Sequence, residues 1–395
     1  MLLKANEKLV TILERTLNLV DYRLVDHGKR VAYLVYKKLY PLALYNNREL
    51  RDICMLALLH DVGAYKTDDV SDIVHFDTQN IWSHSIYGYL FLKYFSPLKE
   101  LAPVVLFHHA LPDRLDGLSS EQKKLALLLN ECDREDIRIN IREKNYASSP
   151  STDKEFEDLF RSAEFTKDDM ESYIKMIVFC IDFRSPQTLL HTFAASFVAE
   201  SLAVLAGFNA DETEKIRTSA MLHDIGKMGT PLHILESTST ELTPHDMEIM
   251  RRHVVHSAEV LKGCVCDYVY NTAVNHHERL NGKGYPRRLG ENEIAPSDRL
   301  MAVADLFSAM CVSRSYQKAK PKDKAIHILE SMKTYNLLDS GYIDLAIKHY
   351  DEISDALRIK SEPVIKLYDD IKREFFWLNN KFSQGKFDYV YAGEL

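Results

Sequence analysis

Histidine and aspartate residues recur along this chain in a pattern that suits metal binding. Seven of them in the second half stand at or near the ends of apolar stretches: His191, His223, Asp224, His253, His276, His277 and Asp305. Neutral imidazole and carboxylate are ligands that Zn, Mn, Fe, Co and Ni accept. One buried histidine is more often a hydrogen-bonded core residue than a ligand. Seven in an order that recurs elsewhere in the chain are not explained by packing, so the pattern predicts a metal site.

The adjacent pair His223 and Asp224 indicates how such a site would be arranged. The pair ends the apolar stretch TSAMLHD, just before Gly226. A carboxylate there can bridge two cations while imidazoles hold each one. Two metal ions about 4 Å apart lower the pKa of a shared water and neutralise charge on a phosphorus centre. The chemistry predicted for this half of the chain is therefore phosphoester hydrolysis.

The segment ERLNGKGYP, residues 278–286, follows the pair His276 and His277 directly. Two glycines allow close approach to a ligand and leave backbone N–H groups available to phosphate. Alone, the segment would be an ordinary tight turn, but its position beside two candidate ligands favours a binding role. Four basic residues add cationic groups for phosphate oxygens: Lys227, Lys283, Arg314 and Lys318.

The first half of the chain repeats this pattern. Its members, in the same order, are His27, His60, Asp61, His84, His108, His109 and Asp133. The first gap is 33 residues in one set and 32 in the other (60 − 27 and 223 − 191). The contexts MLALLHDVG and SAMLHDIG also agree. Agreement at five stations predicts duplication of one module.

Helical elements must position these residues. Segments such as LRDICMLALLH and HTFAASFVAESLAVLA place apolar residues three and four apart, which is typical of amphipathic or buried helices. Alternating strand patterns are scarce, so the sequence predicts an all-α protein. A polar, Ser- and Pro-containing stretch predicts a linker at 146–160. It would separate a first domain, residues 1–145, from a second, residues 161–395.

Composition narrows the possible partners. The net charge is −8, and no long run of Lys or Arg occurs, so binding to a nucleic acid polymer is disfavoured. No apolar stretch reaches the roughly 20 residues of a membrane span, and the first residues lack the features of a signal peptide. We therefore expect a cytoplasmic protein. Cys264 and Cys266 form a Cys-x-Cys with no second pair, which favours helix packing over metal binding.

The strings MLHDIGKMGTP, MRRHVVHSAEVL, HHERLNGKGYP and RLMAVADLFSAMCVSRSYQKA together resemble the HD-GYP family of bacterial phosphodiesterases. The similarity spans roughly residues 185 to 350. Members of the family open the 3′–5′ phosphodiester ring of cyclic di-GMP, and some prefer 3′3′-cyclic GMP-AMP. The resemblance implies two tandem helical HD-type domains, of which the second is the HD-GYP domain.

The resemblance also implies roles for single residues. His191, His223, Asp224 and Asp305 would hold one metal ion, and Asp224 would bridge to a second ion held by His253, His276 and His277. Asp224 and Lys227 would be catalytic, and Lys227 would bind the scissile phosphate. Substrate would further contact Gly284, Tyr285, Pro286, Arg314 and Lys318.

Three positions depart from the family pattern. Members with three metal ions have a Glu four residues before the first His, where this chain has Gln187. Two divalent transition-metal ions (Fe, Mn, Ni, Co or Zn) are therefore expected. Asn281 replaces the usual Asp of the loop, and Gln317 replaces a common Arg. These replacements leave the choice between the two cyclic dinucleotides open.

The first module departs further. Its segment HHALPDRLDGLS has no GYP, and no Lys follows Gly63 directly. The complete order of ligands keeps a metal site there plausible, whereas the absent loop argues against catalysis. The alternatives are a regulatory domain that retains metal and a packing domain that retains only the residues.

Two alternatives remain for the whole chain. It could bind a cyclic dinucleotide as a sensor without hydrolysing it, or it could be a nucleotidase or another HD-type phosphohydrolase. The order of ligands and the loop favour hydrolysis of a cyclic dinucleotide. A homodimer is compatible with the sequence, which contains no signal for or against it.

Overall fold

The computed structural model describes most of the chain. The described residues are 7–20, 25–66, 81–115, 117–141, 152–162, 165–184, 190–237, 241–311, 321–387 and 389. Four residues singled out from the sequence lie outside these ranges: Gln187, Arg314, Gln317 and Lys318.

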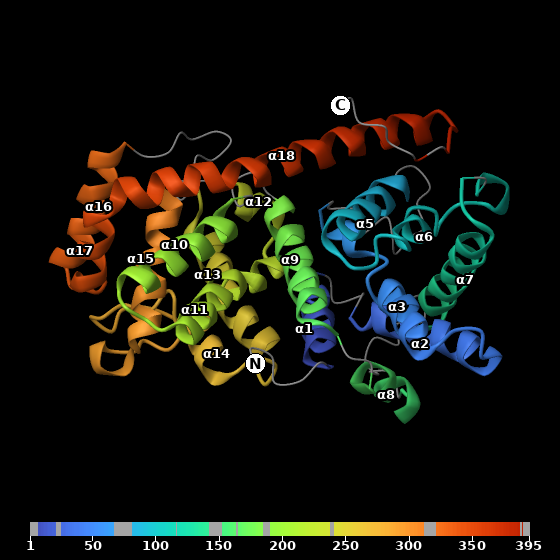
Figure 1. Ribbon diagram of the computed structural model, residues 1–395, viewed down its shortest axis with the longest axis horizontal. Coiled ribbons are helices and arrows are strands. Elements are labelled where there is room, and N and C mark those ends of the chain that lie inside the picture. The colour runs from blue at the N-terminus through green and yellow to red at the C-terminus, as the bar shows by residue number, and fades with distance from the viewer. Residues whose placement is uncertain are drawn as a thin grey trace. The chain divides into compact units, whose positions relative to one another are not determined.

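The described residues form helices and turns without a β-strand, which confirms the predicted all-α class. They fall into two compact modules. The N-terminal module contains Ala5–Cys180 and Tyr368–Leu395, and the C-terminal module contains Ile181–Leu367. Each module is helical by itself. Figure 1 labels the helices and colours them in chain order.

The division between the modules falls within α9 (Lys167–Arg184). Of the predicted linker, residues 146–151 lie outside the described part, and α8 (Lys154–Ser162) covers most of the remainder. Helix α18 (Tyr350–Ser383) belongs to both modules, because its residues from Tyr368 onward group with the N-terminal one. The domain limits 1–145 and 161–395 remain a prediction about independently folding units.

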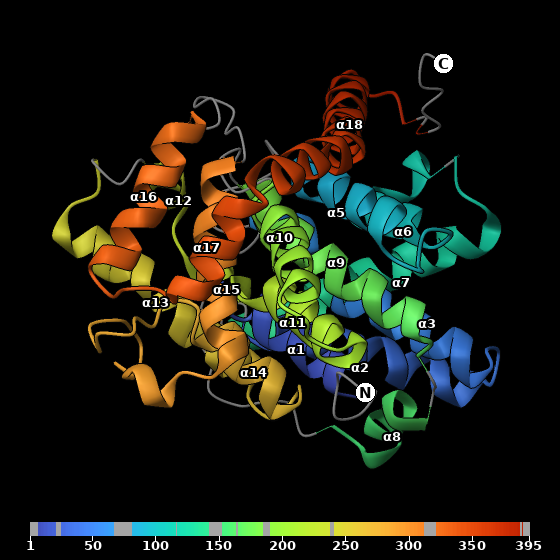
Figure 2. The ribbon, with the colours of Figure 1, turned by 60° about the vertical axis from the view of Figure 1, so that its left-hand side comes forward.

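The C-terminal module contains the predicted metal site. Its helices are α10 (His191–Leu205), α11 (Ala210–Leu222), α12 (Leu232–Glu236), α13 (Pro244–Leu261), α14 (Asp267–Val274), α15 (Pro296–Cys311), α16 (Lys322–Thr334), α17 (Ser340–Lys348) and the first part of α18. Short 3-10 turns are η6 (Ile225–Gly229) and η7 (Glu291–Glu293). Figure 2 shows α10, α11 and α15 grouped together, with α16 and α17 beyond them.

The N-terminal module repeats the arrangement on earlier residues. Its helices are α1 (Glu7–Leu17), α2 (His27–Leu39), α3 (Asn47–Leu58), α5 (Ile81–Phe95), α6 (Ala102–Leu106), α7 (Ser120–Asp136), α8, most of α9 and the last part of α18. Short turns are η2 (Tyr40–Leu42), η3 (Val62–Lys66), η4 (Pro112–Arg114) and a π-helical turn η5 (Ile137–Ile141).

Equivalent helices pack against equivalent neighbours in the two modules. In the N-terminal module α2 contacts α3 and α7, α5 contacts η3 and α6, and α6 contacts α7. In the C-terminal module α10 contacts α11 and α15, α13 contacts η6 and α14, and α14 contacts α15. The matching set of contacts confirms the tandem duplication predicted from the histidine and aspartate spacing.

The helix that leads into each His-Asp pair begins with the same cap. Asn46 accepts hydrogen bonds from the backbone of α3, and Glu49 bonds back to Asn46 N. Asn209 and Glu212 form the same reciprocal box at the start of α11. Each box satisfies N–H groups that a helix start leaves unpaired. The caps set where α3 and α11 begin, and hence where their ends place His60 and His223.

The C-terminal module has one continuous apolar core. Small and branched residues of α10, such as Ala195 and Val198, pack with Ile216 of α11 and Phe307 of α15. Helices α16, α17 and the start of α18 close the other side, where Ile353 is buried. This core fixes α10, α11 and α15, which carry four of the predicted ligands.

A glycine lets η6 approach α13 closely. A Cβ built on Gly226 would lie 2.0 Å from His253 O and 2.5 Å from Ser257 N. Gly226 N donates to Ser257 Oγ, and that hydroxyl donates to His223 O. Gly63 is equally tight against His84 O, at 2.0 Å. The close approach brings a histidine of the next helix to each His-Asp pair.

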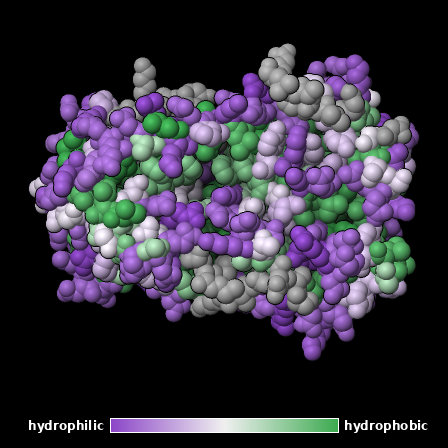
Figure 3. Space-filling model, viewed as in Figure 1, coloured by the Kyte–Doolittle hydropathy of each residue, from purple (hydrophilic) through white to green (hydrophobic). Residues whose placement is uncertain are grey.

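Hydrophilic and hydrophobic residues are interspersed over the face drawn in Figure 3. Within the described residues, no helix combines the length and the apolar character that crossing a membrane requires.

Gly226→Ala is expected to destabilise the protein by about 3 kcal/mol, because the added methyl group meets backbone atoms that cannot rotate away. Urea unfolding followed by circular dichroism measures the change. Gly290→Ala is the matched control, since the nearest atom to its built Cβ is Glu293 Oε2 at 3.6 Å. Equal midpoints for the two variants would contradict the close approach.

Candidate metal centre

Asp224 lies at the centre of the predicted ligands of the C-terminal module. Its Oδ2 lies 3.1 Å from His191 Nε2 and 3.1 Å from His223 Nε2. Its Oδ1 faces the other way and lies 3.3 Å from His253 Nε2. The two carboxylate oxygens are thus divided between two groups of imidazoles.

The remaining predicted ligands complete the two groups. His191, His223 and Asp305 place one ligand atom each within 4.8 Å of one another. The same holds for His253, His276 and His277. Asp305 Oδ1 lies 3.2 Å from His191 Nε2. The structure therefore brings all seven predicted side chains together.

Backbone carbonyls orient three of the imidazoles. The Nδ1 atoms of His223, His253 and His276 lie 2.7, 2.6 and 2.6 Å from the carbonyl oxygen three residues earlier. A carbonyl oxygen only accepts, so each Nδ1 carries the proton and donates it. The lone pair on each Nε2 is then directed into the cluster, as metal ligation requires.

The electrostatics of the cluster favour neutral imidazoles on the side of His253. Burial lowers the pKa of His253 to about 4 and that of His276 to about 3. Burial also lowers the pKa of His277, aided by its histidine neighbours. These three rings are therefore uncharged at neutral pH, the form that binds metal.

His191 differs from them. Burial opposes its charge, but hydrogen bonds to Asp224 and Asp305 outweigh burial and raise its pKa to about 9. The pKa of Asp224 lies well below its usual range, since His223 and Lys227 outweigh the effect of burial. Metal entering this group must displace the proton of His191.

Two buried atoms at the centre have no hydrogen-bond partner: His223 Nε2 and Asp224 Oδ1. An unpartnered buried polar atom costs free energy, and a cation between these atoms would remove that cost. Five imidazoles and two carboxylates are a donor set suited to first-row transition metals. The residues present therefore fit a divalent metal centre.

Lys227 stands beside this cluster. Its Nζ lies 2.5 Å from Asp224 Oδ2, and it is held by the η6 turn. The ammonium group of Lys227 therefore faces the same space as the ligand atoms of the cluster. It can neutralise an anionic ligand there.

The loop after His277 folds back over the second group of imidazoles. Tyr285 N donates to His277 O at 3.2 Å, and the two rings lie 4.7 Å apart. The Arg251 guanidinium lies over the Tyr285 ring, 5.6 Å from its centroid. Gly284 passes so close to Arg279 N that a Cβ would lie 2.4 Å away. Pro286 and Lys283 are exposed.

Glu278, for which no role was predicted, holds this loop in place. The side chain is buried, and its Oε1 accepts hydrogen bonds from Arg287 N and Arg288 N. Its Oε2 accepts from Leu289 N. The Arg279 guanidinium also stabilises this loop, because it donates to His276 O and Glu278 O. In the sequence, the position of Glu278 directly after the His276-His277 pair was the signal that could have indicated this role.

For several residues, the structure does not test the role predicted from the sequence. Arg314, Lys318 and Gln187 lie outside the described residues, so their roles remain predictions. Cys264 is buried, and Cys266 precedes α14. Neither cysteine belongs to a group of potential ligands among the described residues.

The N-terminal module brings its own predicted ligands together as well. His27, His60 and Asp133 form one group, and Asp61, His84, His108 and His109 form another. The Ala64 side chain is buried where Lys227 stands in the other module. The two modules thus share the ligand arrangement and differ in the neighbouring cation.

Comparison with known proteins agrees with this arrangement. The family model of the HD domain matches residues 179–341. The 3′3′-cGAMP-specific phosphodiesterase 1 of Vibrio cholerae is 25% identical over 391 residues, covering 85% of this chain and 89% of that protein. A cyclic di-GMP phosphodiesterase of Thermotoga maritima is 34% identical over 180 residues, covering 45% of this chain and 48% of that protein.

A crystal structure of a cyclic GMP-AMP specific phosphodiesterase of V. cholerae has the same fold. The TM-score is 0.52 at 16% identity, covering 88% of this chain and 98% of the other. Fold and clustered side chains define the C-terminal module as a helical HD domain with a candidate metal centre. The relatives that match this module and its GYP loop are cyclic-dinucleotide phosphodiesterases, and the chain is similar to them.

Glu278→Gln is expected to lower the free energy of unfolding by about 2 kcal/mol, because hydrogen bonds from three N–H groups to a buried carboxylate are weakened. Urea unfolding measures this change. Glu293→Gln is the control, since Glu293 caps the exposed Gly290 N and an amide oxygen preserves that bond. A Glu278→Gln variant as stable as the control would show that the carboxylate does not hold the loop.

Proposed function

We propose that the C-terminal module hydrolyses the 3′–5′ phosphodiester bond of a cyclic dinucleotide and releases a linear dinucleotide. The division of the Asp224 oxygens between two groups of imidazoles carries this proposal. His191, His223 and Asp305 would hold one divalent ion and His253, His276 and His277 a second, with Asp224 between them. When bound, such ions lower the pKa of a water molecule and neutralise phosphate charge.

The residues of the chain supply orientation and charge around the phosphate. Lys227 would bind a phosphate oxygen, since its ammonium group lies beside Asp224 at the centre of the cluster. Tyr285 and Gly284 would shape the wall of the site next to His277. Pro286, Arg314 and Lys318 complete the proposed substrate contacts, as the family resemblance implies.

The relatives support this substrate class and leave the base open. The V. cholerae protein that matches over both modules is named for 3′3′-cGAMP. The T. maritima protein, of which the chain spans about half the length, is named for cyclic di-GMP. Both substrates therefore belong in the assay. A cytoplasmic location and a homodimer remain expectations.

Purified protein with Mn²⁺ or Fe²⁺ is expected to convert cyclic di-GMP, 3′3′-cGAMP or both into linear products, measured by chromatography. Asp224→Ala should abolish turnover, because it removes the carboxylate whose two oxygens face the two groups of imidazoles. Asp211→Asn, an exposed carboxylate on α11, is the control and should stay active. Turnover that persists in Asp224→Ala would exclude this site. Tight binding without product from the unaltered chain would favour a sensor.

Lys227→Ala is expected to lower kcat/KM by about 100-fold, because one cationic contact to the developing phosphate charge is lost. Its metal content, measured by mass spectrometry of the elements, should match the unaltered chain. Lys215→Ala is the control, since Lys215 pairs with exposed Asp211 on the same helix. A Lys227→Ala variant with unchanged kcat/KM would contradict the phosphate role.

A further inference from the structure

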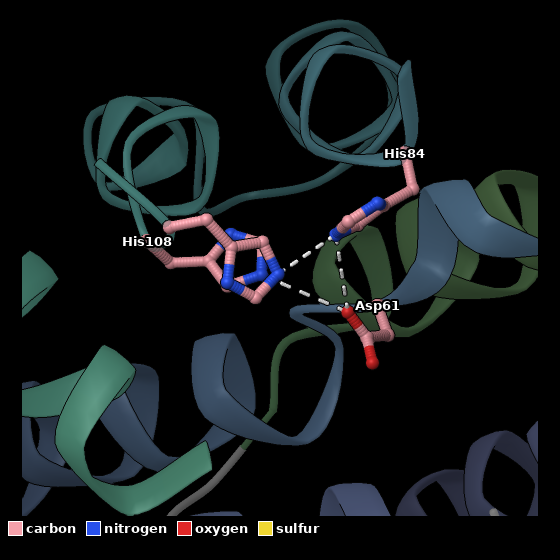
Figure 4. A group of neighbouring side chains, drawn as sticks. Asp61, His84 and His108 are labelled. Atoms are coloured by element: carbon pink, nitrogen blue, oxygen red, sulfur yellow. Dashed lines mark hydrogen bonds and ion pairs between the residues drawn. The ribbon is translucent and has the colours of Figure 1, made fainter. Parts of the chain in front are cut away.

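The N-terminal module contains a second cluster of the same composition, arranged around Asp61. Asp61 Oδ2 lies 3.4 Å from His60 Nε2 and 3.6 Å from His27 Nε2. Its Oδ1 lies 3.7 Å from His108 Nε2 and 3.8 Å from His84 Nε2. Figure 4 shows the Asp61 carboxylate directed at the rings of His84, on α5, and His108, after α6. Asp61 thus divides its oxygens as Asp224 does.

Several buried polar atoms point into this cluster and have no hydrogen-bond partner within the described part of the chain. They are His27 Nε2, His60 Nε2, His108 Nε2, both carboxylate oxygens of Asp61 and both of Asp133. Leaving two carboxylates unsatisfied in the interior costs several kcal/mol. His84 Nε2 and His109 Nε2 also face each other at 3.0 Å. Cations between these atoms would satisfy all of them.

Neighbouring groups orient the imidazoles for ligation. His60 Nδ1 and His108 Nδ1 lie 2.7 and 2.5 Å from carbonyl oxygens three residues earlier, so both donate. His27 Nδ1 lies 2.7 Å from Asp136 Oδ2, and Arg30 holds Asp136 with two hydrogen bonds. A carboxylate behind a ligating histidine fixes the ring and strengthens the ligand. A cluster retained only for packing has no need of this support.

The N-terminal cluster is more enclosed than the C-terminal one. The side chains of His27 and Asp133 are 3% and 1% exposed, against 15% and 14% for the equivalent His191 and Asp305. Ala64 stands where the C-terminal module has Lys227. A pocket lined by His27, Lys29, His60 and Asp61 lies beside this cluster.

We propose that the N-terminal module holds its own two-metal centre for first-row divalent ions. His27, His60 and Asp133 bind one ion and His84, His108 and His109 the other, with Asp61 bridging. The ions join α2, α5, α7 and the ends of α3 and α6 at one point. Their role is to stabilise the module rather than to hydrolyse a substrate.

The full chain carrying Asp224→Asn weakens the C-terminal cluster, because it removes the carboxylate that faces both of its groups of imidazoles. The ions lost when Asp61→Asn is added are then those of the N-terminal centre. After removal of metal with a chelator, the Asp224→Asn chain is titrated with Zn²⁺ and separately with Mn²⁺. We expect it to retain about two ions per chain after desalting. Saturation should raise its melting temperature by about 5 °C. Neither readout depends on hydrolysis, so the result stands even if no cyclic dinucleotide is turned over.

Asp61→Asn in the Asp224→Asn background is the matched variant. It should lose the remaining ions and the thermal shift, while circular dichroism shows whether the helices persist. If the double variant does not fold, the titration of Asp224→Asn alone decides. A chain carrying Asp224→Asn that binds neither ion and shows no thermal shift would overturn the proposal. So would a double variant that folds and keeps the same two ions.

Discussion

A buried aspartate among imidazoles constrains everything else in each module. Asp224 and Asp61 are 4% and 5% exposed, and a charge that far from water must be compensated by hydrogen bonds or cations. Each carboxylate meets histidines on both sides, and those histidines come from different helices. Helices α10, α11, α13, α14 and α15, and their equivalents in the N-terminal module, are therefore tied to one point. The close approach at Gly226 and Gly63 is what allows the histidines of α13 and α5 to reach it.

The two modules share one helical arrangement and differ in the residues beside the clusters. The ligands and the element contacts persist in both modules. The C-terminal module adds Lys227 beside its cluster and the loop held by Glu278. The N-terminal module has Ala64 instead, and adds Asp136 and Arg30 behind His27. Its α5 is also joined to the last part of α18, because Lys93 and Tyr94 contact the buried Glu374. The two modules thus differ in the groups beside a shared arrangement of histidines and aspartates.

Residue spacing was enough to predict the fold class and which histidines and aspartates would cluster, because helical periodicity and histidine order are local properties of a sequence. The all-α fold and the tandem arrangement follow from them, and the seven ligands of the C-terminal module do meet. Contacts between distant residues were not accessible. The pairing of Arg30 with Asp136 joins α2 to α7, and no pattern near either residue indicates it. Nor does the sequence indicate that residues after Tyr368 belong with the first module, since that depends on contacts such as Phe375 with Tyr87. Glu278 was missed because the three N–H groups it binds lie nine to eleven residues further on.

We propose that Asp224 lies between two cations. Crystals of the full chain grown with Mn²⁺ and measured at the manganese absorption edge would locate them. We expect two anomalous peaks on opposite sides of the Asp224 carboxylate, one within coordination distance of His191, His223 and Asp305 and the other of His253, His276 and His277. Peaks elsewhere, with none beside Asp224, would contradict this proposal.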